Sequence, residues 1–407
     1  MAEAAGSVAG GAARVGAGKV AGWAGGLSVE AAIEGGYASG GGVPEGSAGG
    51  LPSPLLERSV RLERDAVLIL DRRVFPHEIV WVTARSGAEV ADAMRQMVTQ
   101  STGPIFAALA ALVLTARQQA GRPVAEAVAA VREAGALLIG ARPTNNSVGD
   151  AVRAVLAAVE AQAVQPQAGA SAARGAWDAA GLVAVVEDEA AGQARYFRRR
   201  CALLAEHAAG LLPDGARVLT HCWMDSYLIE LVRAVHTAGK RLRYVATETR
   251  PYLQGARLTA HTLAELGQDV TLVTDGMAAA VLSPFSALGR VDALVTAADR
   301  VSMDGHVFNK VGTLGAAVAA HAFGVPFYVL IQAPDPLSPT AKDVVVERRD
   351  GAEVLSVQGV RTASPLVEQA YYPAFDVTPP RFVTRIVTDR GPFEAESVSG
   401  YFDEGAV

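Results

Sequence analysis

Short apolar runs alternate with stretches of helical spacing through the second half of this 407-residue chain, and this alternation constrains its fold most. The runs cover Arg217 to Thr220, Leu242 to Ala246, Val270 to Thr274 and Ala293 to Thr296. Strands that alternate with helices along a chain form a parallel sheet with right-handed crossovers. The sequence therefore predicts an α/β protein whose second half is a Rossmann-like domain with a parallel sheet.

Each of these runs is followed by a residue that could do chemistry. Cys222, Glu248, Asp275 and Asp299 come after the four runs in turn, and an Asn309-Lys310 pair lies a little further on. In parallel sheets, ligands bind in the crevice outside the carboxyl ends of the strands. We therefore expect these side chains to gather around one pocket, which points to an enzyme.

The first half of the chain has mainly helical patterns after a small β piece. Strand-like runs at Ala66 to Asp71 and Ile79 to Thr83 precede apolar residues at helical spacing. A long helix is expected from about Gly175 towards Leu212, with a break along its length. Residues 1–54, rich in glycine and alanine, are expected to be a flexible tail, because glycine loses much entropy on ordering and has little to bury.

We therefore predict two folded domains between two tails. A mainly helical N-terminal domain with its small β piece covers residues 55–205, and the Rossmann-like C-terminal domain covers 206–395. Residues 396–407 are expected to be a second tail after the folded part.

Composition argues against several classes of function. A formal charge of −6 argues against nucleic acid or an anionic membrane as the partner. No run reaches the about 18 apolar residues of a membrane span, and no secretory signal opens the chain. The two cysteines, Cys201 and Cys222, suggest a reducing compartment. We expect a cytoplasmic protein.

No cofactor or metal is expected. The histidines His77, His221 and His261 lack metal-ligand spacing, and neither a Walker-type loop nor a Gly-x-Gly-x-x-Gly motif follows the first strand.

The candidate catalytic residues have structural alternatives. Cys222 precedes a predicted helix, whose dipole would lower the pKa of the thiol, although a small buried hydrophobe is an equally good interpretation. Asp299 follows an apolar run, where desolvation favours the protonated form of a general acid. A helix cap or an ion pair with Arg300 is the alternative role for Asp299.

Two further features are weak evidence when taken alone. Asn309-Lys310 stands before Gly312-Thr313 and resembles a turn that binds anions at a helix N-terminus. Arg142 lies in the helical half, where a solvated surface arginine is the ordinary interpretation.

Several segments, in order, resemble the 5-methylthioribose-1-phosphate isomerase family. That family is related to archaeal ribose-1,5-bisphosphate isomerases and to the regulatory subunits of the eukaryotic initiation-factor-2B exchange factor. The resemblance runs from about Leu55 to about Gly391. Its motifs are Leu219 to Cys222, Glu248 to Thr259, Ala297 to Thr313, Gly324 to Tyr328 and Pro373 to Pro379, with Arg142 to Thr144 in the first half.

The resemblance implies a homodimer that isomerises a ribose 1-phosphate without a cofactor. Cys222 matches the family's catalytic cysteine and Asp299 its catalytic acid. The residues that match substrate-binding positions are Gln100, Ser101, Thr102, Arg142, Gln254, Asn309 and Lys310. A protonated Asp299 would open the sugar ring, and a Cys222 thiolate would then remove the C2 proton, with a hydride shift from C2 to C1 as the alternative.

Two departures bear on the substrate. The family's Arg-Gly-Ala-Pro turn is here Gln100-Ser101-Thr102-Gly103 before Pro104, so a neutral side chain replaces an arginine. After the cysteine, Trp223-Met224-Asp225 replaces asparagine and small residues. We therefore expect a 5-substituted or 5-deoxy ribose 1-phosphate, in methionine salvage or in a specialised pathway. The alternatives are a ribose-1,5-bisphosphate isomerase and a regulatory subunit that binds a nucleotide or sugar phosphate without turnover.

Overall fold

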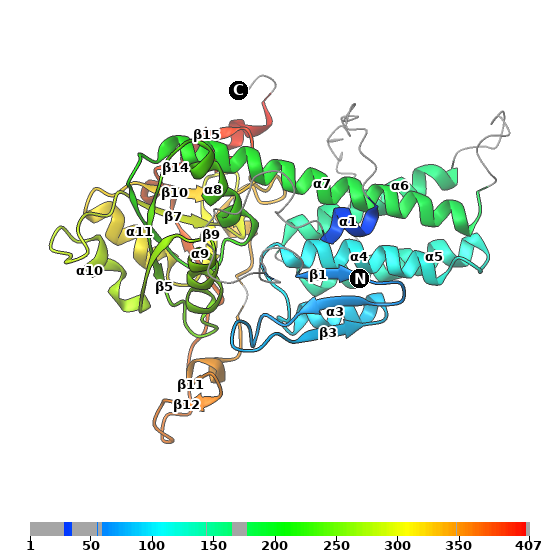
Figure 1. Ribbon diagram of the computed structural model, residues 1–407, viewed down its shortest axis with the longest axis horizontal. Helices are drawn as coiled ribbons and strands as arrows, with labels where there is room; N and C mark the ends of the chain where they lie inside the picture. Colours follow the sequence, from blue (N-terminus) through cyan, green and yellow to red (C-terminus); the bar gives the residue numbers. More distant parts are fainter. Residues whose placement is uncertain are drawn as a thin grey trace, which may run out of the picture.

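The computed structural model describes residues 28–34, 55, 59–143, 145–164, 177–346 and 348–403. Helices and a small sheet from the first half lie beside a larger sheet from the second half (Figure 1). The small sheet is antiparallel, in the order β1 (Val60–Leu62), β2 (Val67–Leu70) and β3 (Trp81–Ala84). The α/β class predicted from the sequence is confirmed.

The helical half is built around one buried helix. Nearly every residue of α4 (Gly103–Gln118) is buried, as the unbroken apolar run from Ile105 requires. The helices that cover α4 are α3 (Gly87–Arg95), α5 (Val124–Ala141), α6 (Asn146–Val164) and α7 (Ala179–Leu211). This packing fixes the loop before α4, which reaches the site described below.

The long helix α7 joins the two halves. It runs without interruption from Ala179 to Leu211, so the predicted break is wrong. Its glycines are tolerated because α7 packs along α4 and α6 at one end and against α8 (Ser226–Thr237) at the other. Figure 1 shows α7 extending over both halves, so it connects the helical half rigidly to the large sheet.

The expectation of a wholly unpacked tail at residues 1–54 is wrong for one segment. Val29–Glu34 forms helix α1, whose Val29, Ala32 and Ile33 are buried. Their i, i+3, i+4 spacing gives a short apolar stripe that the glycine-rich composition masks. Apart from residues 28–34, the predicted tail lies outside the described part of the chain. Leu55, where the N-terminal domain is predicted to begin, is buried.

The large sheet has the strand order β15-β14-β10-β7-β4-β5-β6. Its strands are β4 (Arg217–Thr220), β5 (Arg243–Thr247), β6 (Asp269–Val273), β7 (Ala293–Ala297), β10 (Phe327–Leu330), β14 (Arg385–Thr388) and β15 (Gly391–Phe393). All pairs are parallel except β14–β15. Strands β5 and β6 are added on one side of β4, and β7, β10 and β14 are then added on its other side. The strand order therefore reverses between β4 and β7. Ligand crevices in such sheets open at this reversal.

The four predicted strands of this sheet are confirmed to within a residue. The helices of this half are α8, α9 (Ala260–Glu265), α10 (Ala278–Leu282) and α11 (Thr313–Ala322), with a π-helix at η1 (Gly255–Thr259) and 3₁₀ turns at η2 (Asp275–Met277), η3 (Ala341–Asp343), η4 (Gly351–Val354) and η5 (Pro380–Phe382).

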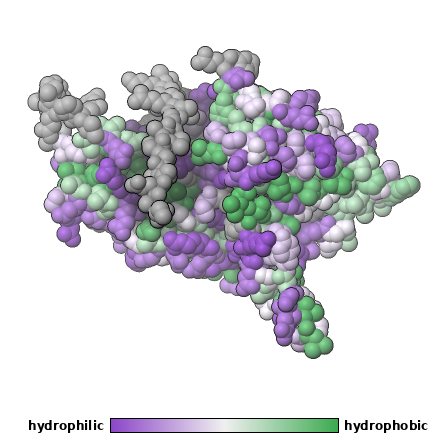
Figure 2. Space-filling view, turned by 180° about the vertical axis from the view of Figure 1, so that it is seen from behind, coloured by the Kyte–Doolittle hydropathy of each residue, from purple (hydrophilic) through white to green (hydrophobic). Residues whose placement is uncertain are grey.

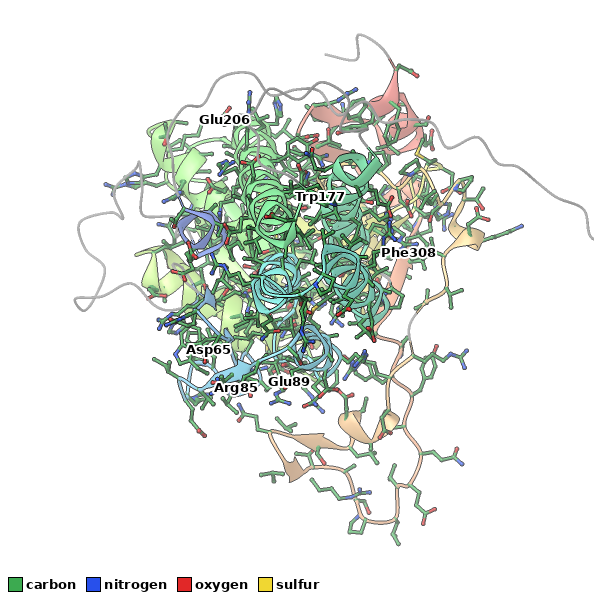
Figure 3. All side chains as sticks on the ribbon, turned by 90° about the vertical axis from the view of Figure 1, so that its right-hand side faces the viewer. Asp65, Arg85, Glu89, Trp177, Glu206 and Phe308 are labelled. Atoms are coloured by element: carbon green, nitrogen blue, oxygen red, sulfur yellow. The ribbon has the colours of Figure 1, made fainter. Side chains whose placement is uncertain are left out.

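Two smaller β pieces were not predicted. One is a three-stranded antiparallel sheet of β8 (Arg300–Val301), β9 (Val307–Lys310) and β13 (Phe375–Thr378), in the order β13-β9-β8. The other is the hairpin of β11 (Ser356–Val357) and β12 (Val360–Arg361), which projects from the body in Figures 1 and 3.

The predicted C-terminal tail is also wrong in its described part. Ala395–Phe402 forms the 3₁₀ helix η6, in which Val398 and Tyr401 are buried. The Tyr401 hydroxyl donates to the Asp389 carboxylate at 2.9 Å, which ties this segment to the end of β14. Within the described ranges, no helix is long and apolar enough to cross a membrane.

Candidate active site

One cavity of about 190 Å³ lies between the helical half and the carboxyl edge of the large sheet. The residues that match the family's catalytic and substrate-binding positions all line it: Gln100, Ser101, Thr102, Arg142, Cys222, Gln254, Asp299, Asn309 and Lys310. Glu248 and Asp275 do not line it, contrary to the expected convergence. They follow β5 and β6, on the side of the sheet away from the β4–β7 reversal, and Asp275 instead accepts the Thr249 and Arg250 backbone N–H groups.

The fold places Cys222 and Asp299 on the two strands that flank this reversal. Cys222 follows β4 in a left-handed conformation with φ 68°, and its backbone N–H donates to Thr249 Oγ1 at 3.0 Å. The Thr259 hydroxyl, in the π-helix, donates to the Cys222 carbonyl. Asp299 follows β7, and its backbone N–H donates to the Phe308 carbonyl at 3.0 Å. The sheet itself therefore brings a thiol and a carboxyl to one cavity.

Of the two interpretations of Cys222 from the sequence, the thiol with a lowered pKa is wrong. Burial raises the pKa of Cys222 to about 12, against the attraction of Lys310, and the Asp299 carboxylate raises it further. Helix α8 begins only after its N-cap residue Asp225. Cys222 therefore lies outside the first turn, where the helix dipole acts. Without substrate, Cys222 is a neutral thiol.

The raised pKa can be tested by alkylation. Because the thiolate is the reactive form, we expect iodoacetamide to modify Cys222 about tenfold faster for each pH unit between about pH 7 and pH 9. Mass spectrometry after timed quenching measures the rate. The Cys222→Ser variant is the control, since Cys201 is fully buried. A rate that is constant over this range would show a thiolate already present at neutral pH.

His221 supports this turn from behind. Its Nδ1 lies 2.6 Å from the Thr247 hydroxyl and its Nε2 lies 2.9 Å from the Val311 carbonyl. The carbonyl can only accept, so Nε2 carries a proton, whereas the Thr247 hydroxyl can either donate to Nδ1 or accept from it. Burial lowers the pKa of His221, which favours the neutral ring. His221 therefore joins the end of β4 to the turn after Lys310 and is not a cation in the site.

The loop before α4 is anchored on the start of α8. The Ser101 hydroxyl donates to the Trp223 carbonyl at 3.1 Å, and the Thr102 hydroxyl lies 2.9 Å from that of Ser226. The Thr102 N–H donates to Asp225 at 3.1 Å. Both hydroxyls are thus used within the protein, and their contacts position the loop beside Cys222.

Gln100 and Gln254 face each other in the cavity wall. Gln254 Nε2 donates to Gln100 Oε1 at 3.3 Å, which leaves Gln100 Nε2 and Gln254 Oε1 buried without a partner among the described residues. A buried amide group without a partner is costly, and a bound ligand could satisfy it. Gly255 has to be glycine, because a Cβ there would lie 1.7 Å from the Thr247 carbonyl.

Asn309 and Lys310 are held by a strand from far along the chain. Strand β13 pairs with β9 so that Phe375 lies opposite Lys310, whose ammonium is 4.5 Å from the Phe375 ring centroid. Asp376 accepts the Gly312 and Leu314 N–H groups at the start of α11. Burial raises the pKa of Asp376 to about 6, despite these bonds. The Pro373 to Pro379 segment thus positions the cationic end of the site.

Arg142 is not an ordinary solvated arginine. It ends α5 at the cavity, where its Nη1 lies 2.7 Å from the Met97 sulfur. Nearby, the Asn145 side chain donates to the Ser101 carbonyl at 3.1 Å, which joins the end of α5 to the loop before α4. Thr144, the last residue of the RPT motif, lies outside the described residues.

Sequence reasoning missed several charged groups around the cavity. Arg72 pairs with Asp225 at 2.8 Å, Arg200 pairs with Asp389, and Arg300 pairs with Asp335 at 3.4 Å. Members of each pair are far apart in the chain, so no local pattern marks them. A local signal exists at Asp225, an acidic residue directly after Trp223-Met224, whereas Arg72 lies between the charged residues Asp71 and Arg73.

The fold and cavity together define an α/β protein with a small-molecule site at the reversal point of its parallel sheet. The chain belongs to the initiation factor 2 subunit family, whose model matches residues 100–395. This membership confirms the superfamily indicated by the sequence motifs.

Relatives with named activities cover most of the chain. A methylthioribose-1-phosphate isomerase of Anaeromyxobacter sp. (strain K) is 38% identical over 347 residues, 83% of this chain and 93% of that protein. A 5-deoxyribose 1-phosphate isomerase of Moorella thermoacetica is 36% identical over 335 residues, 80% of this chain and 91% of that protein.

Solved structures agree with this picture. The 5-methylthioribose 1-phosphate isomerase from Pyrococcus horikoshii superposes with a TM-score of 0.73 at 28% identity, covering 86% of this chain and 97% of that chain. The translation initiation factor eIF-2B subunit delta from A. fulgidus gives 0.68 at 30% identity, covering 83% and 96%.

Proposed function

We propose that this protein is an aldose-ketose isomerase that converts a 5-substituted or 5-deoxy ribose 1-phosphate to the corresponding ribulose 1-phosphate. The observation that carries this proposal is that Cys222 and Asp299 line the same cavity at the β4–β7 reversal. Arg142 and Lys310 line this cavity too. Relatives with such activities support it, at 38% and 36% identity. Methionine salvage or a specialised pathway would be its setting, and two free thiols fit the cytoplasm.

The reaction requires a proton on the ring oxygen and the removal of the C2 proton. In the unliganded site the thiol proton is on Cys222. We assign the Asp299 carboxylate as the group that accepts the thiol proton. A single proton transfer from Cys222 to Asp299 then makes Asp299 an acid and Cys222 a thiolate. Asp299 then protonates the ring oxygen as the bond from C1 to that oxygen breaks.

The thiolate takes the C2 proton in the same step, and an enol phosphate results. Cys222 returns its proton to C1, and Asp299 regains a proton from the C2 hydroxyl as the ketone forms. Protons therefore balance without any group from outside the pair, and no cofactor is needed.

The 1-phosphate is assigned to the cationic and amide groups of the cavity. Lys310 and Arg142 supply positive charge, and Gln254 and Gln100 supply the buried amide atoms that lack partners. Charge-assisted hydrogen bonds are worth roughly 1.5–3 kcal/mol each, so the replacement of an arginine by Gln100 weakens this end by about one such contact.

The two alternatives receive less support. A regulatory subunit without turnover would have no need for a thiol and a carboxyl together at the reversal point. A ribose-1,5-bisphosphate isomerase would need further unpaired positive charge, whereas the other arginines that line the cavity, Arg200, Arg300 and Arg349, already have carboxylate partners.

Substitution of the catalytic pair tests the proposal. We expect Cys222→Ser and Asp299→Asn each to lower kcat by about 10²–10⁴-fold with little change in melting temperature, since a general acid or base contributes that much. Ketose formation is measured from methylthioribose 1-phosphate, 5-deoxyribose 1-phosphate and ribose 1,5-bisphosphate. A double variant as active as the wild type would refute the mechanism. If the wild type turned over none of the three, the non-catalytic alternative would gain support.

We also propose a homodimer, as the family resemblance implies. Residues 351–371, which include the projecting hairpin of β11 and β12, form an arm with apolar side chains in solvent. On this arm Leu366 is 92% and Tyr371 70% exposed, and Figure 2 shows apolar surface on the projection. Arg250 fixes the arm by donating to the Val354 and Ser356 carbonyls. Exposed apolar patches of this kind mark protein interfaces.

Light scattering tests the dimer. We expect about twice the chain mass of 42.0 kDa for the wild type and a lower mass for Leu366→Asp. Phe285→Asp is the matched control, because Phe285 is 94% exposed on another part of the surface. A wild-type monomer at micromolar concentration would contradict the proposal.

A further inference from the structure

The cavity extends past Cys222 and Asp299, in the direction away from the amide groups of Gln100 and Gln254. Gln254 follows β5, on one side of β4, whereas Gln332 and Asp389 follow β10 and β14, on the far side of β7. Cys222 and Asp299 lie between these two ends. Because a furanose bound across the pair presents its C1 phosphate to one end, its C5 substituent has to face the other.

At the end of the cavity beside Gln332, the Arg200 guanidinium of α7 donates to the Gln332 carbonyl. Phe197, Tyr227, Met224 and Ile331 also line the cavity, as does the ion pair of Arg300 and Asp335. Burial raises the pKa of Tyr227, so this phenol stays neutral. A C5 substituent directed to Gln332 therefore meets the Arg200 guanidinium among apolar side chains.

Arg200 is held on three sides. Its Nε donates to Asp389, and its Nη2 donates to the Gln332 carbonyl and to the Tyr401 hydroxyl, each at 3.0 Å. The Tyr401 hydroxyl in turn donates to Asp389 at 2.9 Å. Among the contacts of the described residues, only Nη1 of this guanidinium is left for a ligand.

The charge of Arg200 is already compensated. The side chains of Arg200 and Asp389 are 17% and 10% exposed, so little water screens their attraction. Burial opposes the charged guanidinium, but the Asp389 hydrogen bond and charge outweigh it and raise the pKa of Arg200. A second anion placed here would have to approach the Asp389 carboxylate as well, which is unfavourable.

We propose that Arg200, held by Asp389 and Tyr401, determines which C5 substituent the enzyme accepts. It donates one hydrogen bond to a neutral substituent that carries an acceptor, such as a hydroxyl or ether oxygen, and its ion pair with Asp389 excludes a C5 phosphate. This inference rests on the proposed isomerase function and names the substrate class more closely. Arg200 contacts the substituent and takes no part in proton transfer.

The test compares three substrates that differ only at C5: ribose 1-phosphate, 5-deoxyribose 1-phosphate and ribose 1,5-bisphosphate. In Asp389→Asn the guanidinium loses its counter-charge while the shape of the site is kept. We expect kcat/KM for the bisphosphate, relative to 5-deoxyribose 1-phosphate, to rise by about tenfold or more, as for a gained charge pair.

A second variant tests the hydrogen bond. Arg200→Met is expected to lower kcat/KM for ribose 1-phosphate by about tenfold while 5-deoxyribose 1-phosphate, which has no acceptor at C5, changes little. If the methionine variant does not fold, Arg200→Lys takes its place. Because this variant keeps the positive charge, it should retain part of the preference for ribose 1-phosphate over 5-deoxyribose 1-phosphate. Arg199→Met is the control, since Arg199 is exposed on the same helix; its substrate ratios should equal those of the wild type.

The outcomes separate this inference from the function on which it rests. Unchanged substrate ratios in both Asp389→Asn and Arg200→Met, with an active wild type, would overturn the role of Arg200 and leave the isomerase intact. A wild type inactive on these three substrates and on methylthioribose 1-phosphate would instead overturn the proposed function. A wild type that prefers the bisphosphate would contradict the exclusion of a C5 phosphate.

Discussion

The active site depends on one buried ion pair that joins the two halves of the protein. Arg72, after β2, is 1% exposed, and its Nη1 donates to Asp225 and to the Gln100 carbonyl, both at 2.8 Å. Asp225 also accepts the Thr102 N–H. A buried charge is stable only when hydrogen bonds and an opposite charge compensate the loss of water. The contacts of Arg72, Asp225 and the loop before α4 therefore depend on one another. They place the loop before α4 directly beside the turn that carries Cys222.

A second arginine strengthens the same junction. Arg257, in the π-helix after Gln254, donates through Nη1 to the Arg72 carbonyl at 2.6 Å and the Phe75 carbonyl at 2.9 Å. The segment that carries Gln254 is therefore tied to the segment that carries Arg72. Single π-helical turns occur often at functional sites, and these hydrogen bonds hold the one that follows Gln254. Both walls of the cavity between the halves are thus cross-linked by buried arginines.

Much of the large sheet could be predicted from the sequence because its signals are local. Apolar runs such as Arg217 to Thr220 and the glycines after the helices mark each βα unit, and topology alone brings Cys222 and Asp299 to one edge. Strand β13 could not be predicted, because it is stabilised by pairing with β9, which lies more than sixty residues earlier. Helix α1 was hidden by the glycines around it.

The electrostatic properties of the site were harder to predict. A motif shows that a cysteine precedes a helix, but the pKa of Cys222 depends on its burial and on charges from three other segments. Arg72 and Asp225 are 153 positions apart. The roles of the nine predicted site residues stay proposals. Strand order predicted that Cys222, Asp299 and the Asn309-Lys310 pair would share one cavity, and the family resemblance supplied the other residues.

A double-mutant cycle on Arg72 and Asp225 tests most directly whether this ion pair joins the halves at the site. Arg72→Met, Asp225→Asn and the double variant are compared with the wild type by denaturant unfolding and by kcat/KM. The account predicts that each single change costs about 3–5 kcal/mol of stability and that the double change costs clearly less than their sum. Single effects that add within about 0.5 kcal/mol would contradict it, because they would show that the two side chains act independently.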